Sequence, residues 1–242
     1  MQRSTPRLTR ILACAAVPVM LVLAGCSSDS GSDAGKGSGS SSSASQDQQG
    51  GQKPATVAPA KYTKLPNPCK SVSTKTIEKL VPATKSKAGT SGKSSDITSR
   101  GSCSWNGLDD NGVKGSQYRW FDVSFLRYDS ETSLGVSGQK RAENNYAKEI
   151  SKAQATDGAK NVKTSPAKGV GEAGTAIRYE LKKTGEDFSY ATIVTRTDNV
   201  VITLTYNGTG YAGAKSPDSA DLMESAVAAA KEAVASVGVA NS

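Results

Sequence analysis

Few residues in this chain have types and spacings that could do chemistry. The 242 residues contain no histidine, which excludes Ser-His-Asp and Cys-His nucleophiles and histidine metal ligands. Three short patterns match the SxxK, SxN and KTG set of penicillin-binding enzymes, at residues 137–140, 104–106 and 183–185. Their order is wrong for such an enzyme, because SxN precedes SxxK. We therefore predict that the patterns are coincidental and that the chain has no catalytic residues.

Another pattern, GxGxxG, occurs at residues 169–174. In dinucleotide-binding proteins a strand precedes these glycines and a helix follows them. Here the alternating apolar residues of a strand follow instead, so we predict a glycine turn and no cofactor. Residues 109–112, Asp-Asp-Asn-Gly, resemble part of a calcium loop. The first ligand and the final glutamate of that loop are missing, so we predict a plain turn and no metal site.

Three carboxylates leave an enzymatic alternative open. Asp122, Glu172 and Glu180 would support acid–base chemistry if two of them converged in a cleft with separated pKa values. The sequence alone does not show whether they converge. We therefore predict a non-catalytic protein and keep the carboxylates as an alternative.

The first 25 residues have the three-part order of a secretory signal peptide. Three arginines precede an apolar run at residues 11–23, which is shorter than the about 20 residues of a membrane-spanning helix. Residues 23–26, Leu-Ala-Gly-Cys, resemble a bacterial lipobox. The resemblance implies cleavage between Gly25 and Cys26, and diacylglyceryl and palmitate groups on Cys26. Because two acyl chains anchor a protein stably, we expect the chain on the outer face of the cytoplasmic membrane.

A tether and one domain follow the signal. Residues 27–60 are dominated by Ser, Gly, Gln and Ala, a composition too polar to bury enough surface to order the chain. We predict a disordered tether at residues 26–60, which begins with the lipidated cysteine and spans roughly 30 Å. Residues 61–238 have the length of one domain, and residues 239–242 form a short tail.

Apolar residues of the domain follow helical and strand spacings in turn. The predicted elements are, in order, a helix at 73–81, strands at 101–106 and 117–128, a helix at 137–155, strands at 175–181, 188–194 and 200–206, and a helix at 216–238. The separators at 183–186 and 197–199 are short and rich in turn residues, which predicts hairpins and an antiparallel sheet. We predict an α+β fold, with two or three helices packed mainly on one face of the sheet.

The last helix is the clearest of these elements. Ser216 is its predicted N-cap, Pro217 its first residue, and Gly238 its end. Its predicted apolar stripe consists of Met223, Val227, Ala230, Val234 and Val237.

Cysteine usage predicts one disulfide. Cys14 is removed with the signal and Cys26 is acylated, so Cys69 and Cys103 are the thiols that remain in an oxidising setting. We predict a bond between them, with two free thiols as the alternative. In the chain-entropy model, closing a loop of about 35 residues stabilises the fold by about 4 kcal/mol.

Several features occur in the order found in a known family. They are the lipobox, the tether, Pro68-Cys69 before a short helix, Cys103-Ser104-Trp105 on a strand, and residues 169–173 before another strand. Together they resemble the actinobacterial lipoprotein family catalogued as domain of unknown function 3558, over roughly residues 65–237 and the signal. The resemblance implies an envelope lipoprotein with a Cys69–Cys103 bridge and no assigned reaction. The polar stretch at residues 85–99 departs from the family pattern.

These observations favour a binding or accessory module of the cell envelope. The expected partner is an envelope protein or a wall polymer, in addition to the membrane that holds the lipid anchor. Aromatic residues near loops are frequent interface hot spots, so the candidate binding residues are Trp105, Tyr118, Trp120 and Tyr128. Core packing is the alternative role for each of them.

A carrier protein is the alternative function. It would hold a small apolar or amphipathic ligand in a cavity between the sheet and the C-terminal helix, although only 5% of the residues are aromatic. Eight lysines in residues 61–93 could attract an anionic surface, but we favour an ordinary solvated surface there. Because Tyr62 is the single aromatic residue among these lysines, where stacking sites use several, we predict no nucleic-acid partner.

Overall fold

The structure, a computed structural model, describes residues 56–242. The predicted signal peptide, its cleavage site at Gly25 and Cys26, and most of the predicted tether lie outside the described residues. Lipidation and cleavage therefore remain predictions. Among the described helices, none is both long and apolar enough to cross a membrane.

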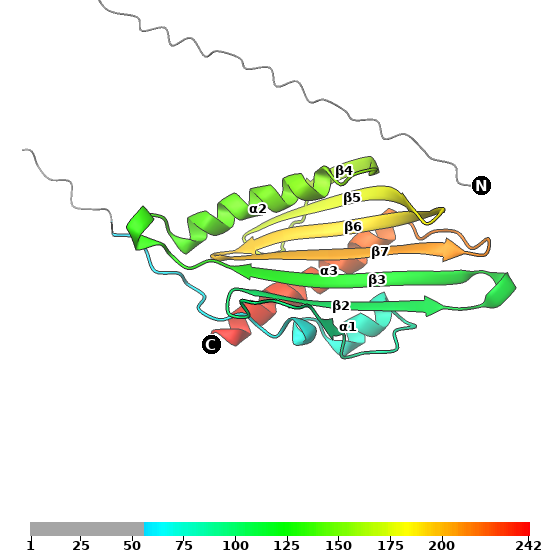
Figure 1. Ribbon diagram of the computed structural model, residues 1–242, viewed down its shortest axis with the longest axis horizontal. Coiled ribbons are helices and arrows are strands. Elements are labelled where there is room, and N and C mark those ends of the chain that lie inside the picture. Colours follow the sequence, from blue (N-terminus) through cyan, green and yellow to red (C-terminus); the bar gives the residue numbers. More distant parts are fainter. Residues whose placement is uncertain (1–55) are drawn as a thin grey trace, which may run out of the picture. The chain divides into compact units, whose positions relative to one another are not determined.

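The described residues form one seven-stranded antiparallel sheet and three α-helices (Figure 1). The strands are β1 (Thr90–Ser91), β2 (Arg100–Asp109), β3 (Ser116–Arg127), β4 (Lys160–Pro166), β5 (Ala173–Lys183), β6 (Glu186–Thr197) and β7 (Val200–Tyr211). The helices are α1 (Thr74–Leu80), α2 (Gly138–Gln154) and α3 (Ser219–Ala240). Across the sheet the strands lie in the order β1-β2-β3-β7-β6-β5-β4. The predicted α+β fold is confirmed.

Serine side chains cap the first two helices where the sequence predicts helix starts. The Ser73 hydroxyl accepts a hydrogen bond from the Thr76 amide at 3.3 Å, and the Ser137 hydroxyl accepts one from the Lys140 amide at 3.2 Å. Each bond satisfies an amide that has no partner within its helix. The serine of the SxxK pattern is therefore a helix cap in this fold.

The start of α3 differs from the prediction. Its N-cap is Asp218, whose carboxylate accepts a hydrogen bond from the Ala220 amide at 2.6 Å. Ser216, the predicted cap, instead donates its hydroxyl to the carbonyl of Asp187 at 2.6 Å. This contact with the start of β6 holds Ser216 before the helix, and the next capping residue in the chain takes its place.

α3 packs on the sheet through its smallest residues. Its side chains without exposed surface are Ala226, Ala229, Ala230, Ala233 and Val237. Of the predicted stripe, Ala230 and Val237 are buried, whereas the larger Met223, Val227 and Val234 are partly buried at its margin. Alanines allow the helix backbone to approach the strands closely, so the interface is filled without large side chains.

The strands bury side chains on both faces of the sheet. On the face that we call the α3 face, β3 contributes Phe121, Val123 and Phe125 to a core shared with α1 and α3. On the opposite face, the α2 face, a smaller core contains Ala142, Ile177, Tyr179, Phe188, Tyr190, Val194 and Val201. Two helices thus cover the α3 face, and α3 is visible behind the strands in Figure 1.

The predicted disulfide is confirmed. It joins Cys69 to Cys103 across a sequence separation of 34 residues. Cys69 lies in a short 3-10 helix, Pro68–Lys70, and Cys103 lies in β2 with its side chain almost completely buried. The bond therefore fastens the segment before α1 to a strand of the sheet.

α2 covers only one end of the α2 face. At its start, Gly138 lies next to the side chain of Asn199, in the turn between β6 and β7. Near its end, Gln154 donates a hydrogen bond to Thr164 of β4 at 2.9 Å. The helix therefore crosses the sheet near this turn, and the far end of the same face lies beyond it.

Candidate binding groove

An open groove lies at the end of the α2 face that α2 does not cover. Its volume is about 630 Å³. The lining residues, which we call the aromatic groove, are Tyr118, Trp120 and Asp122 of β3, Lys183 and Thr184 at the β5–β6 turn, Phe188 and Tyr190 of β6, and Thr205, Asn207 and Tyr211 of β7. Most of these residues stand on strands in the middle of the sheet, so the floor of the groove is held rigidly by backbone pairing.

Strand register places one aromatic residue on each side of an asparagine. Asn207 of β7 pairs with Trp120 of β3 on one side and with Tyr190 of β6 on the other. Adjacent strands are about 4.8 Å apart, so the backbones that carry Trp120 and Tyr190 are roughly 10 Å apart. Tyr179 of β5 continues this row, and its ring stacks on the Tyr190 ring with centroids 4.7 Å apart.

Two of the buried side chains have polar groups without a protein partner. Asn207 and Tyr190 are 7% and 6% exposed, and neither side chain forms a hydrogen bond to another described residue. A polar atom that is completely buried without a hydrogen-bond partner lowers the stability of the fold. The polar side-chain atoms of Asn207 and Tyr190 are not completely buried. The Asn207 carboxamide and the Tyr190 hydroxyl therefore reach the space of the groove.

Asp122 adds one acidic group to the groove. Burial raises the pKa of its carboxyl from 3.8 to about 6, against the opposing effect of a hydrogen bond from the Trp120 indole N–H at 3.3 Å. Burial also raises the pKa of Tyr118, and the nearby phenols of Tyr211 and Tyr190 add to this shift. The three tyrosine side chains thus converge on one region.

The groove can bind both flat and polar parts of a ligand. Aromatic rings offer apolar faces, while the carboxylate, carboxamide and hydroxyl groups offer hydrogen bonds. Lys183 places its ammonium 5.2 Å from the centroid of the Tyr190 ring, which is a cation–π distance. Asp122 is the one carboxylate among the lining residues, so the described groove holds no pair of carboxylates for acid–base chemistry.

The structure separates the four aromatic residues predicted as binding residues. Tyr118 and Trp120 line the groove. Trp105 points to the α3 face, is 2% exposed, and donates its indole N–H to the Lys87 carbonyl at 3.1 Å. Tyr128 is half-buried beside α2, with the Arg141 guanidinium 5.6 Å from its ring. The fold therefore places Trp105 in the core and Tyr128 outside the groove.

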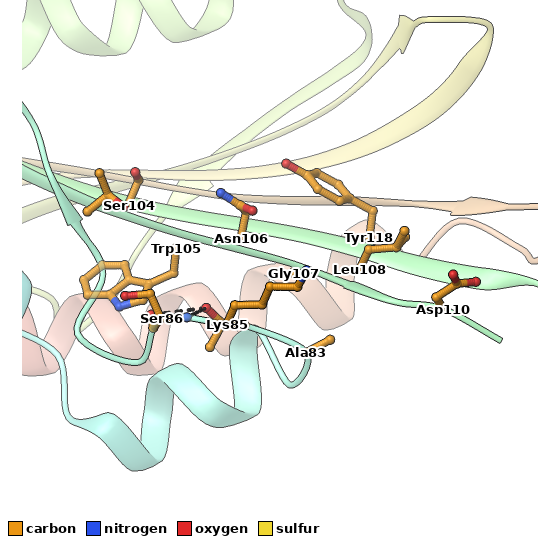
Figure 2. Close-up of a pocket in the computed structure, with 12 residues that line it drawn as sticks. Ala83, Lys85, Ser86, Ser104, Trp105, Asn106, Gly107, Leu108, Asp110 and Tyr118 are labelled. Carbon is orange, nitrogen blue, oxygen red and sulfur yellow. Dashed lines mark hydrogen bonds between the residues drawn. The ribbon is translucent and has the colours of Figure 1, made fainter. Parts of the chain in front are cut away.

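A second pocket, of about 480 Å³, lies at the β2 edge of the sheet. Figure 2 shows Asn106 and Tyr118 on one side of this edge, and Trp105 on the other side near Lys85 and Ser86. Its walls combine exposed polar side chains with the exposed apolar Leu108 and the buried Trp105. Tyr118 lines both pockets, so the two pockets share one wall residue.

The other carboxylates of the enzymatic alternative lie elsewhere. Glu172 forms an ion pair with Arg196 at 2.9 Å, and Glu180 accepts a hydrogen bond from Asn161 at 2.8 Å. Neither lines the groove with Asp122. Within residues 56–242 there is also no group of three or more His, Cys, Asp or Glu side chains that could hold a metal ion.

The glycine-rich and KTG patterns are turns in this fold. Gly169 and Gly171 have positive φ values of 72° and 65°, and the chain then enters β5 rather than a helix. Thr184 and Gly185 also have positive φ values, 51° and 89°, and connect paired ends of β5 and β6. Two positive φ values are typical of a type I′ hairpin turn.

Several groove residues were not predicted from the sequence. The main ones are Phe188, Tyr190, Asn207 and Tyr211. Period-two spacing identifies Tyr190 as a strand residue with a buried side chain. It does not show how far along the sheet α2 covers that face. Asn207 carried no usable signal, because the strand predicted from period-two spacing ends at residue 206, whereas β7 continues to Tyr211.

Comparisons with known proteins do not assign a family. No family model matches the chain, and no curated protein matches it. A solved structure with some similarity is that of LpqN, described as involved in cell envelope biogenesis of Mycobacterium tuberculosis. The match has 15% sequence identity and a TM-score of 0.27, and covers 50% of this chain and 65% of that chain. The resemblance to domain of unknown function 3558 stays a prediction.

Proposed function

We propose that this chain is a lipid-anchored lipoprotein of the cell envelope that binds an envelope component in the aromatic groove. The observation that carries the proposal is the pair Asn207 and Tyr190, which are nearly buried as residues while their polar groups open to the groove without partners among the described residues. Proteins satisfy such groups with a ligand or with water. A rigid groove that holds them ready, beside the half-buried rings of Tyr118, Trp120 and Tyr211, has the composition of a binding site.

The proposed location rests on two features. The lipobox at residues 23–26 supports lipid attachment at Cys26, and the disulfide between Cys69 and Cys103 fits an oxidising compartment outside the cytoplasm. Replacement of Cys26 by serine should abolish labelling by radioactive palmitate and release the protein from the membrane fraction. Labelled, membrane-bound Cys26→Ser protein would refute this part of the proposal.

Binding is favoured over catalysis because the groove holds a lone carboxylate. Acid–base chemistry normally needs two groups with separated pKa values, and among the lining residues only Asp122 is acidic. We therefore propose an accessory or binding role without a reaction of its own.

The alternative of a carrier with a cavity beneath the C-terminal helix receives no support. That interface contains Ala226, Ala229, Ala230 and Ala233, which have no exposed surface. We place the binding surface on the opposite face of the sheet.

Site-specific photo-crosslinking in the host tests the groove directly. A photoreactive residue at Tyr211, on the half-buried rim, should give a defined adduct when the full chain is in its native envelope. The matched control is Ala235, an exposed position on α3, which should give none. Equal adducts at both positions, or none at Tyr211, would contradict the proposal.

A further inference from the structure

We infer that the aromatic groove binds a neutral saccharide. This inference rests on the proposed function, because it takes the groove as the binding site, and it adds the chemical class of the ligand. Four features of the groove favour such a ligand: its hydrogen-bonding groups, its aromatic surface, its charge and its position on the sheet.

The polar groups of the groove require a ligand with both donors and acceptors. The Asp122 carboxylate only accepts hydrogen bonds when it is ionised, whereas the Asn207 carboxamide and the Tyr190 hydroxyl can donate and accept. Sugar hydroxyls also donate and accept. An aliphatic chain in the groove would cover Asn207 and Tyr190 without satisfying them, which disfavours binding.

The aromatic surface suits the apolar faces of sugar rings. Trp120 and Tyr190 stand on the two strands that flank Asn207, so a ring seated above the carboxamide has an aromatic side chain on each side. Aromatic faces carry negative charge density and attract the C–H groups of a pyranose. Tyr179 stacks against Tyr190 and holds that ring in place before a ligand arrives.

The charge of the groove argues against a polyanion. Its lining residues include one cation, Lys183, and one acid, Asp122. Polyanions such as nucleic acids are bound through several phosphate contacts with Lys and Arg side chains. The groove offers a single lysine and opposes it with a carboxylate, which favours a neutral ligand.

A peptide fits the groove less well than a sugar. The floor belongs to β3, β7 and β6, which are paired on both sides, so no free strand edge is available for an added peptide strand. A proline-rich helix can dock on aromatic grooves, but proline has no N–H. Such a ligand would leave the Asn207 carbonyl and the second oxygen of Asp122, the one that Trp120 does not contact, without donors.

The test uses the full chain, purified in a detergent without a sugar headgroup. The probes are maltotriose, cellotriose and triacetylchitotriose, with decaproline for comparison. The chain has two tryptophans, and the groove contains Trp120 while Trp105 is buried in the core. We expect at least one trisaccharide to change the Trp120 emission saturably, with its affinity confirmed by calorimetry.

Three variants locate the binding. Asn207→Leu should weaken binding of the same trisaccharide at least tenfold, and Tyr190→Phe should weaken it several-fold. Asn144→Leu alters an exposed asparagine of α2 and should leave the affinity unchanged. Thermal unfolding of each variant shows whether it is folded, so a loss of binding is attributed to the removed group.

Two results would overturn the inference. One is the absence of trisaccharide binding at about 10 mM, and the other is binding that Asn207→Leu does not weaken. If the Tyr211 crosslink still captures an envelope component while no trisaccharide binds, the ligand class is wrong and the proposed function stands. Selective binding of decaproline would identify a peptide ligand instead. If neither crosslinking nor trisaccharide binding occurs, both proposals fail.

Discussion

Replacing Asn207 with leucine should make the protein more stable while it removes binding. Asn207 is 7% exposed, and its carboxamide has no partner among the described residues. Leucine has a similar branched shape, and the open groove has room for its larger volume. The substitution exchanges a poorly satisfied polar group for an apolar one, a change that raises stability when no hydrogen bond is lost.

The magnitude follows from the cost of burying an amide. Mutational data place this cost at about 1–3 kcal/mol for an amide without a hydrogen bond. Because the Asn207 carboxamide reaches the groove and can bind water, we take the low end, a gain of about 1 kcal/mol. For a domain of this size, such a gain raises Tm by roughly 2–4 °C.

A second buried asparagine provides the matched control. Asn199 has no exposed surface, and its carboxamide forms three hydrogen bonds with backbone groups of Tyr62 and Tyr128, at 2.8 to 2.9 Å. Asn199→Leu would leave these groups unsatisfied, with a loss of about 3 kcal/mol and a fall in Tm of roughly 6–12 °C. The same substitution should therefore have opposite effects at the two sites.

Differential scanning calorimetry of the two variants without ligand gives the answer. A rise for Asn207→Leu and a fall for Asn199→Leu would support a functional role for Asn207. A fall in Tm of several degrees for Asn207→Leu would refute the reasoning, because it would mean that the carboxamide stabilises the fold.

Three further predictions concern other groups. The pKa of Asp122 is higher in the folded protein, so its contribution to stability is present below pH 4 and is lost as pH rises through about 6. Between pH 5 and 7, urea unfolding should show that wild type loses about 1 kcal/mol of stability relative to Asp122→Asn. Equal pH profiles of the two proteins would contradict this. Reduction of the Cys69–Cys103 bond should cost about 4 kcal/mol, measured by urea unfolding with and without reductant, and an unchanged midpoint would contradict the prediction. Trp105→Ala should destabilise the folded protein by about 3–5 kcal/mol, whereas Trp120→Ala should mainly abolish ligand binding. If thermal unfolding shows comparable stability losses for the two variants, both residues belong to the core.

The sequence predicts most of the fold because period-two and helical spacings are local. The hairpins of β5, β6 and β7 and the start of α1 occur where turn and capping residues indicate them. The disulfide was predicted by counting the free thiols that remain once the signal is removed and Cys26 is acylated, and the structure contains it. Strand β4 was missed, since all its residues are exposed and its Lys and Pro residues are typical of a protected edge strand rather than of an apolar one.

The position of the helices on the sheet was only partly predictable. α2 has one apolar side, but that pattern does not say which face of the sheet it covers or how far it extends. Long-range packing decides which face α2 covers. Within this packing, Tyr146 of α2 is hydrogen-bonded to Thr175 of β5 at 2.6 Å. As a result, the sequence identified Tyr118 and Trp120 as candidates but did not reveal the groove that joins them to Tyr190 and Asn207.

The site itself shows why buried polar residues are more informative than aromatic ones. Trp105 and Trp120 are both strand residues, yet one belongs to the core and the other to the groove. Aromatic type alone does not separate these roles, since aromatic rings suit cores and interfaces equally well. A nearly buried asparagine whose carboxamide has no partner among the described residues has fewer structural roles. Water or a ligand can satisfy it from the open groove, and we propose a ligand.

The most direct test of the account is the side-chain amide signal of Asn207 in nuclear magnetic resonance spectra of the full chain. Addition of a solubilised envelope fraction should shift the Asn207 signal, while the hydrogen-bonded Asn199 signal stays in place. The shift should be absent for an equal fraction from which the crosslinked component has been removed. An Asn207 signal that does not respond, or changes confined to α3, would contradict the claim that the groove is the binding surface.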